Sequence, residues 1–114
     1  MDQALRPELS PDPGLLRLLE HDEQLRVSAK ARDSILALTD RRLIVADERR
    51  LALDVAIDHI RRVQFDIERS RPATLVIVPE EAADEPQVLA IEPDQYLRAA
   101  EALAFIGQRL AELE

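Results

Sequence analysis

The segment SILALTDRRLIVAD, residues Ser34–Asp47, decides the fold of this chain. Two apolar runs, Ile35–Leu38 and Leu43–Ala46, flank the polar tetrapeptide Thr39–Arg42. Each run has the length of a β-strand, and the aspartate in the tetrapeptide favours a turn, so the segment predicts a β-hairpin. Because both apolar runs are continuous rather than alternating, we expect both faces of this hairpin to be covered.

Further strands are predicted on either side of the hairpin. Apolar and polar residues alternate in three segments, and two shorter segments are apolar with β-branched residues. Between the fourth and fifth strands, a turn or a single helical turn is expected to point Ile60 inward. The predicted strands outside the hairpin are Leu25–Ala31, Leu51–Ile57, Val63–Ile67, Thr74–Val78 and Val88–Ile91.

A proline-started helix is expected near each end of the chain. Asp12 and Pro13 are suited to an N-cap and a first helical position, and predict a short helix that lays Leu15–Leu19 against the body. Pro93 likewise starts an amphipathic C-terminal helix of about residues 93–113. Residues 1–12 are interpreted as a loose lead-in to a single domain, residues 13–114. The predicted core stripe of the second helix is Tyr96, Ala99, Ala100, Leu103, Ile106, Leu110 and Leu113, with Gly107 allowing a close approach to the sheet.

The composition fits one globular domain. The chain has 114 residues, of which 46% are hydrophobic and 33% charged, enough for one ordinary core. It has no cysteine, which excludes disulfides and fits a reducing compartment. No segment has the pattern of a signal peptide or approaches the ~20 apolar residues of a membrane helix, so a cytoplasmic protein is predicted.

The net charge of −8 is unevenly distributed. Residues 26–71 carry a net charge of +3, whereas the two flanks together carry −11. A strongly acidic protein is repelled by nucleic-acid backbones unless its basic residues are segregated into a patch. Nucleic acid is therefore not an expected partner.

The phrase Leu38–Ile44, LTDRRLI, resembles the signature hairpin of bacterial PH-like and GRAM-like domains, where the pattern lT-x-x-R-l joins the second and third strands. Glu23, which opens a strand after a polar joint, matches the "G-E" motif of these domains, with Asp22 in place of the glycine. The resemblance covers roughly Leu15 to Leu113. It implies a mainly β member of the α+β class: a seven-stranded antiparallel pleckstrin-homology-like sandwich capped by the C-terminal helix. The alternative is another small α+β domain with an antiparallel sheet and a terminal helix.

No residue constellation in the sequence carries catalytic chemistry. The serines lie outside any G-x-S-x-G context, and two glycines do not make a phosphate-binding loop. His21 and His59 lack a recognised ligand spacing with neighbouring carboxylates. A non-catalytic protein without a metal or cofactor is predicted.

Anionic lipid is the alternative partner. The resemblance implies that a headgroup would bind among the first-to-second, third-to-fourth and sixth-to-seventh strand loops. Together these loops carry −3, because Pro79–Pro86 holds four carboxylates. A negative rim focuses a phosphorylated headgroup poorly, so this function is disfavoured. A small ligand inside the sandwich ranks third, since only 3% of residues are aromatic. The candidate lipid ligands are Lys30, Arg32, Arg49 and Arg50.

Phe105 is predicted to lie nearly opposite the core stripe of the C-terminal helix. Either the segment Leu15–Leu19 covers it, or a protein partner does, most simply a second copy of the chain. The favoured function is therefore a non-catalytic interaction module that self-associates through this face or through a sheet edge. The predicted neighbours of Phe105 on this face are all charged: Arg98, Glu101, Arg109 and Glu112.

Overall fold

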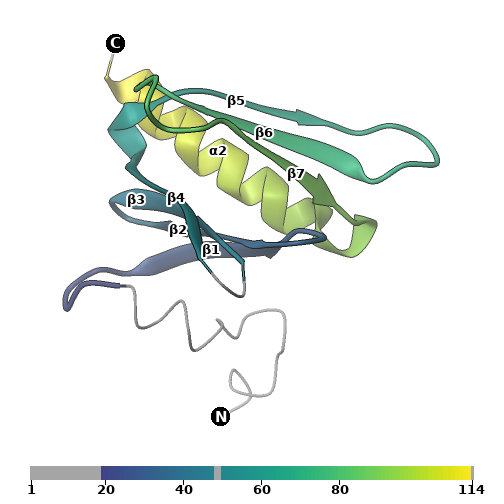
Figure 1. Ribbon diagram of the computed structural model, residues 1–114, viewed down its shortest axis with the longest axis horizontal. Helices are drawn as coiled ribbons and strands as arrows, with labels where there is room; N and C mark the ends of the chain where they lie inside the picture. The colour runs from purple at the N-terminus through teal and green to yellow at the C-terminus, as the bar shows by residue number, and fades with distance from the viewer. Residues whose placement is uncertain (1–18, 48–49, 114) are drawn as a thin grey trace.

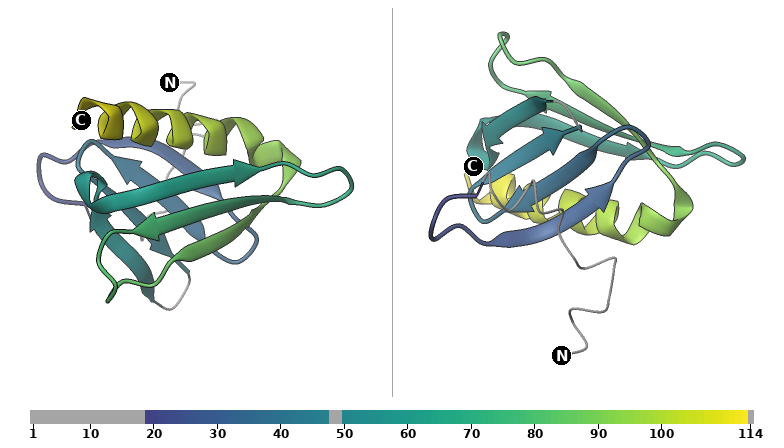
Figure 2. Two further views of the ribbon diagram at one scale, coloured as in Figure 1. Left: turned by 90° about the horizontal axis from the view of Figure 1, so that it is seen from above. Right: turned by 60° about the horizontal axis from the view of Figure 1, so that its bottom comes forward.

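Two antiparallel sheets and a C-terminal helix make up the fold (Figure 1). The computed structural model describes residues 19–47 and 50–113. The first sheet has the order β1-β2-β3-β4 and the second has the order β5-β6-β7. The strands are β1 (Leu25–Lys30), β2 (Ile35–Thr39), β3 (Arg42–Ala46), β4 (Leu51–Ala56), β5 (Ile60–Asp66), β6 (Ala73–Pro79) and β7 (Gln87–Ile91). A 3₁₀ turn, η4 (Pro93–Gln95), leads into the helix α2 (Tyr96–Glu112), which runs along one side of the sandwich and contacts β1 and β5 (Figure 2).

The β2–β3 hairpin confirms the prediction from the sequence, including the burial of both its faces. Leu38 pairs with Leu43, and Ala37 pairs with Ile44. The first pair points into the main core, whereas the second belongs to a separate small cluster on the opposite face. All four side chains are fully buried. The continuous apolar runs in the sequence therefore correctly indicated that both faces of the hairpin are covered.

The connection between the sheets is a single helical turn, η3 (Ile57–His59), as predicted. Ile60 follows it and is buried, but it already belongs to β5, which begins three residues before the predicted start at Val63. Ile67, which the sequence predicts as the last residue of this strand, is 60% exposed. The last ladder pair joins Asp66 to Thr74, so Ile67 lies beyond the strand in the turn to β6.

The buried face of α2 is centred on Ala99, Ala102 and Ile106. The predicted stripe was centred on Leu103, which is about 60° away at 100° per residue. Ala100 is consequently exposed rather than buried, and Leu113 is exposed because it lies beyond Glu112, the last residue of α2. The small alanine side chains explain the rotation, because they let the helix backbone approach the sheets more closely than leucines would.

Two further predictions about α2 are wrong for the same reason. Gly107 does not approach the sheet: it is exposed, and a Cβ added there would meet no atom within 4 Å. Phe105 is half-buried and packs against the main core, with the Arg26 guanidinium 5.9 Å from its ring centroid. Arg26 of β1 thus lies over this ring.

The predicted lead-in, and the predicted N-terminal helix as far as Leu18, lie outside the described residues. Leu19 and Glu20, its last predicted residues, are described and are not helical. Over the described ranges, no helix is long and apolar enough to span a membrane.

The fold predicts that α2 is an integral part of the core. Ile106→Ala should lower the free energy of unfolding by about 2–5 kcal/mol, because it empties a site that is 2% exposed. Leu97→Ala, on a side chain that is 80% exposed, is the matched control and should change stability by less than about 0.5 kcal/mol. Urea denaturation measures both changes. A chain ending at Pro93 should show no cooperative transition, and a cooperative melt of that chain would contradict this account.

Candidate functional site

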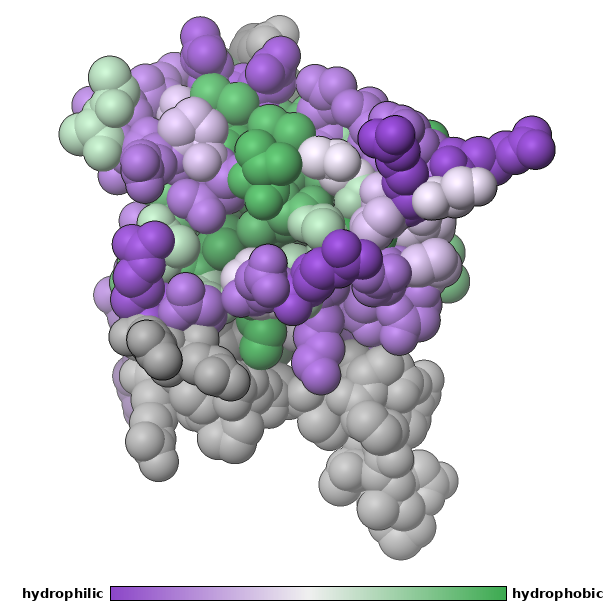
Figure 3. Space-filling model, turned by 45° about the vertical axis from the view of Figure 1, so that its right-hand side comes forward, coloured by the Kyte–Doolittle hydropathy of each residue, from purple (hydrophilic) through white to green (hydrophobic). Residues whose placement is uncertain are grey.

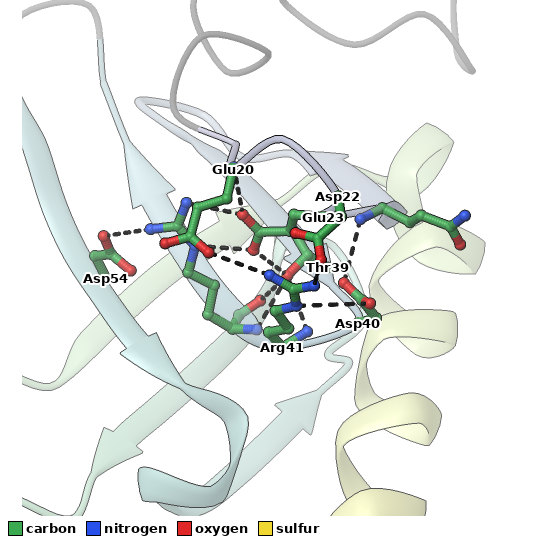
Figure 4. A network of polar contacts seen from close by, with 9 residues as sticks. Glu20, Asp22, Glu23, Thr39, Asp40, Arg41 and Asp54 are labelled. Carbon is green, nitrogen blue, oxygen red and sulfur yellow. Dashed lines mark hydrogen bonds and ion pairs between the residues drawn. The ribbon is translucent and has the colours of Figure 1, made fainter.

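The three motif residues Glu23, Thr39 and Arg42 meet at the β2–β3 turn (Figure 4). The β2–β3 hairpin places Thr39 and Arg42 on either side of the turn, and the joint before β1 brings Glu23 against them. The side chain of Glu23 is fully buried, and Thr39 is fully buried too. We call Glu23, Thr39 and Arg42 the hairpin latch.

The carboxylate of Glu23 is saturated with hydrogen bonds. Arg42 donates to both of its oxygens, from Nε to Oε2 and from Nη2 to Oε1, each at 2.9 Å. The Thr39 hydroxyl donates to Oε2 at 2.6 Å, and the Glu20 amide donates to Oε1 at 2.9 Å. Such two-point guanidinium–carboxylate pairing is stronger and more directional than a single contact. A buried charge of this kind is tolerable only because it is fully paired.

The Thr39 hydroxyl closes the turn as well as binding the carboxylate. Its oxygen accepts hydrogen bonds from the amides of Arg41 and Arg42, each at 3.0 Å, while its proton goes to Glu23. These three bonds use the one donor and two acceptor positions of a hydroxyl. Valine has a similar shape but no hydroxyl, so Thr39→Val would remove the hydrogen bonds to Glu23 and to the amides of Arg41 and Arg42.

A second layer of ion pairs surrounds the latch. Arg42 also donates to Asp54 of β4 at 2.8 Å. Arg41 contacts Glu20 at 3.1 Å and Asp22 at 2.8 Å, so both arginines of the turn hold the chain that precedes β1. These outer pairs are partly exposed to solvent, so each contributes little to stability.

The helix α2 is also tied to this turn. Arg109 donates from Nη1 to the backbone oxygen of Asp40 at 3.1 Å, and its Nε lies 3.5 Å from a carboxylate oxygen of Asp58. Arg109 thus joins α2 to the β2–β3 turn and to η3. A residue predicted to contact a partner chain instead makes contacts within its own chain.

Pairing shifts the pKa values of these groups. The hydrogen bonds from Arg42 are the largest cause that lowers the pKa of Glu23 to about 2, and those from Thr39 and the Glu20 amide act in the same direction, whereas burial opposes them. The hydrogen bonds that Arg42 donates to Glu23 in turn raise the pKa of Arg42 further above its ordinary value. The Arg41 hydrogen bond lowers the pKa of Asp22. All of these groups are therefore charged at neutral pH.

The charged groups of this cluster pair with one another. Its two guanidinium groups contact carboxylates, and the cluster has more acidic than basic members. Among the described residues, no group of three or more His, Cys, Asp or Glu side chains is placed to hold a metal ion, and no buried side-chain polar atom lacks a hydrogen-bond partner.

The structure distributes the predicted partner-binding residues over different environments. Glu101 and Glu112 are exposed on α2, whereas Arg98 and Phe105 are half-buried. Arg109 is engaged with the β2–β3 turn. These five residues therefore do not form one free face around an exposed aromatic ring.

The candidate lipid ligands are likewise not equivalent. Arg32 pairs with Glu92 at 2.6 Å, and its amide donates to the Ala90 oxygen of β7, so the β1–β2 turn is fastened to the end of the second sheet. Lys30 and Arg50 are exposed, and Arg49 lies outside the described residues. The nearby Glu92 carboxylate offsets the positive charge of Arg32, which weakens the attraction of this site for an anion.

Sequence reasoning did not predict the ion pair between Glu23 and Arg42. Nineteen residues separate the two in the sequence, and no helical or strand periodicity relates them. The signal that could have found the pair was the resemblance itself, since Glu23, Thr39 and Arg42 are its characteristic positions.

Comparison with solved structures agrees with this architecture. A crystal structure of a pleckstrin homology domain from Shewanella amazonensis SB2B superimposes with a TM-score of 0.64 at 17% sequence identity, over 85% of this chain and 82% of that one. The chain has the pleckstrin-homology-like (PH-like) fold. No protein-family model matches the sequence, and no curated protein matches it significantly. At this level of identity the PH-like fold is the shared property, and function must be argued from the surface.

The latch predicts a specific acid sensitivity. The pKa of Glu23 is 4.5 before pairing and about 2 in the folded protein, so the charged pair stabilises the fold fully above about pH 4.5. This stabilisation is lost as the pH falls from 4.5 to 2, and it amounts to about 3 kcal/mol. In Glu23→Gln, the free energy of unfolding should fall at pH 7 and depend less on pH below 4.5.

Urea denaturation between pH 3 and pH 7 measures this difference. Glu81→Gln, in the exposed β6–β7 loop, is the matched control and should keep the wild-type pH dependence. If Glu23→Gln does not fold, Thr39→Val offers a milder test, because it removes one hydrogen bond to the carboxylate. Identical acid profiles for the wild type and both latch variants would contradict the role of the buried pair.

Proposed function

We propose that this chain is a non-catalytic PH-like interaction module that associates with a second copy of itself through the outer face of α2. The observation that supports this is an apolar strip on the solvent side of the helix. Its first member, Leu97, is 80% exposed and begins a contiguous row of exposed small residues. The outer α2 face consists of Leu97, Ala100, Ala104, Gly107 and Ala111, all exposed.

The spacing of this strip suits helix–helix packing. Its members follow one another at intervals of three, four, three and four residues, which is the seam that two helices present to each other. Alanine and glycine side chains allow two helix backbones to approach closely. Glu101 and Gln108 are exposed beside the seam and would form part of a polar rim, as in protein interfaces.

A sheet edge is the weaker candidate for self-association. Val88 of β7 is 68% exposed, and its cross-strand neighbour Val76 is half-buried, so the second sheet presents apolar surface at this edge. Figure 3 shows apolar side chains gathered in the middle of one face of the molecule, surrounded by hydrophilic residues. Pro86 and Pro93 flank β7, however, and the amide of Arg32 already binds it. Prolines and such bonds are devices that protect an edge from strand addition.

The proposal predicts that Ala104→Arg abolishes self-association without unfolding the protein. Position 104 is exposed in the middle of α2, and arginine is a good helix former, so the melting temperature should not fall. Light scattering should give the wild type a mass that rises above 12.9 kDa with concentration, whereas the variant should remain at 12.9 kDa.

Gln64→Arg is the matched control, because it adds the same charge at an exposed position of β5, away from α2. This control should associate like the wild type. A wild-type mass of one chain at every concentration would refute the proposal. Phe105→Asp is not a clean test, because Phe105 packs against the core and its loss would also destabilise the monomer.

Anionic lipid binding is expected to be weak or absent. The net charge is −8, and Arg32 is paired with Glu92. Co-sedimentation with phosphatidylglycerol and phosphoinositide vesicles at low salt should leave the protein in the supernatant. Sub-micromolar, salt-sensitive binding that is lost in the Arg49→Glu/Arg50→Glu variant would instead make the protein a peripheral membrane module.

A further inference from the structure

The outer face of the first sheet carries an apolar surface that is distinct from the main core. Its centre is the cross-strand pair Ala37 and Ile44, both of which are 0% exposed. Around this pair, the sheet contributes Leu25, Ile35 and Ala46, each partly buried. We call these five residues the outer-sheet patch. A side chain on the outer face of a sheet reaches full burial only when something other than the sheet covers it.

Within residues 19–47 and 50–113, one apolar residue from outside the sheet packs on this patch. That residue is Leu19, at the beginning of the described chain, and it is itself only partly buried. A single leucine does not cover five side chains spread over three strands. The patch therefore needs more apolar cover than this part of the chain supplies.

The hairpin latch fixes the direction from which the chain arrives. Arg41 holds Glu20 and Asp22, and Arg42 holds Glu23, so the segment after Leu19 is fastened at the end of the first sheet where β2 turns into β3. Leu25 pairs with Thr39, and Ala37 and Ile44 follow along the same hairpin. The latch and the patch are thus neighbours on the same hairpin, and Leu19 already packs against the patch.

The sequence immediately before Leu19 has the required chemistry. Leu15, Leu16 and Leu18 precede it directly, and Arg17 is the single charged residue between Gly14 and Leu19. Leu15 lies four residues before Leu19 and can reach about 13 Å from it when extended, whereas a five-residue strand is about 17 Å long. These leucines can therefore reach the patch members that lie near Leu19.

We propose that the outer-sheet patch is a docking surface for this chain's own N-terminal segment, with Leu15, Leu16 and Leu18 completing the cover that Leu19 begins. The latch would then hold the segment in place by fastening its C-terminal end. Phe105, the other site that this segment could cover, already packs against the core beneath Arg26. This inference is independent of the proposed self-association, which uses α2.

Cross-linking tests the proposal directly, because the chain has no cysteine of its own. The test variant is Leu16→Cys/Ala46→Cys, which places one thiol in the segment and one in the patch. The control is Leu16→Cys/Val88→Cys, whose second thiol is on the other sheet and more exposed, so that reactivity alone would favour the control. With a short bismaleimide at low protein concentration, the test pair should be joined within one chain at least about tenfold faster than the control pair.

A second measurement asks whether the cover contributes to stability. The triple variant Leu15→Asp/Leu16→Asp/Leu18→Asp should lower the melting temperature by about 5 °C or more and increase the binding of an apolar dye. Leu5→Asp, farther from Leu19, should change neither. Cross-links only between chains would show that a second copy covers the patch, and equal rates for the two cysteine pairs would show that the segment does not dock there. Either result would overturn the proposal.

Discussion

A buried carboxylate that cannot be left unpaired is the constraint on which the fold depends. Glu23 is removed from water, so its charge must be met by the guanidinium of Arg42 and the hydroxyl of Thr39. This requirement fixes three things at once: the chain before β1, the turn between β2 and β3, and the register of the hairpin. Through Arg109, the same turn is joined to α2 and hence to the element that closes the sandwich.

The same ion pairs explain why paired arginines in the turn do not make an anion site. Arg41 and Arg42 look like a basic patch in the sequence, but each is directed at carboxylates of its own chain. Charges that are already neutralised locally create little field at a distance. Among the described residues, the outer α2 face and the edge near Val88 expose apolar side chains. The proposed self-association rests on these surfaces.

Gly107 and Phe105 illustrate how burial of one helix face determines the role of every other position. When α2 rotates so that Ala99, Ala102 and Ile106 face the sheets, Gly107 moves to the solvent side. Phe105 lies at the flank of the core rather than on the predicted outer surface. The candidate interface therefore changes. The sequence predicted Phe105 with charged neighbours, whereas the structure exposes a strip of small residues that begins at Leu97.

The sequence by itself determined the elements that depend on local chemistry. The hairpin at Thr39–Arg42, the short connection before Ile60 and the amphipathic helix after Pro93 follow from turn residues and apolar periodicity, although α2 begins at Tyr96 rather than at the predicted Pro93. The hairpin motif and the order of these elements indicated the PH-like fold. Only the tertiary structure decided the rotation of α2 and the pairing of Glu23 with Arg42. Both depend on contacts between residues far apart in the chain. The rotation of α2 depends on how closely its backbone approaches the sheets, and the ion pair depends on which buried charges meet. Neither property leaves a periodic pattern in the sequence.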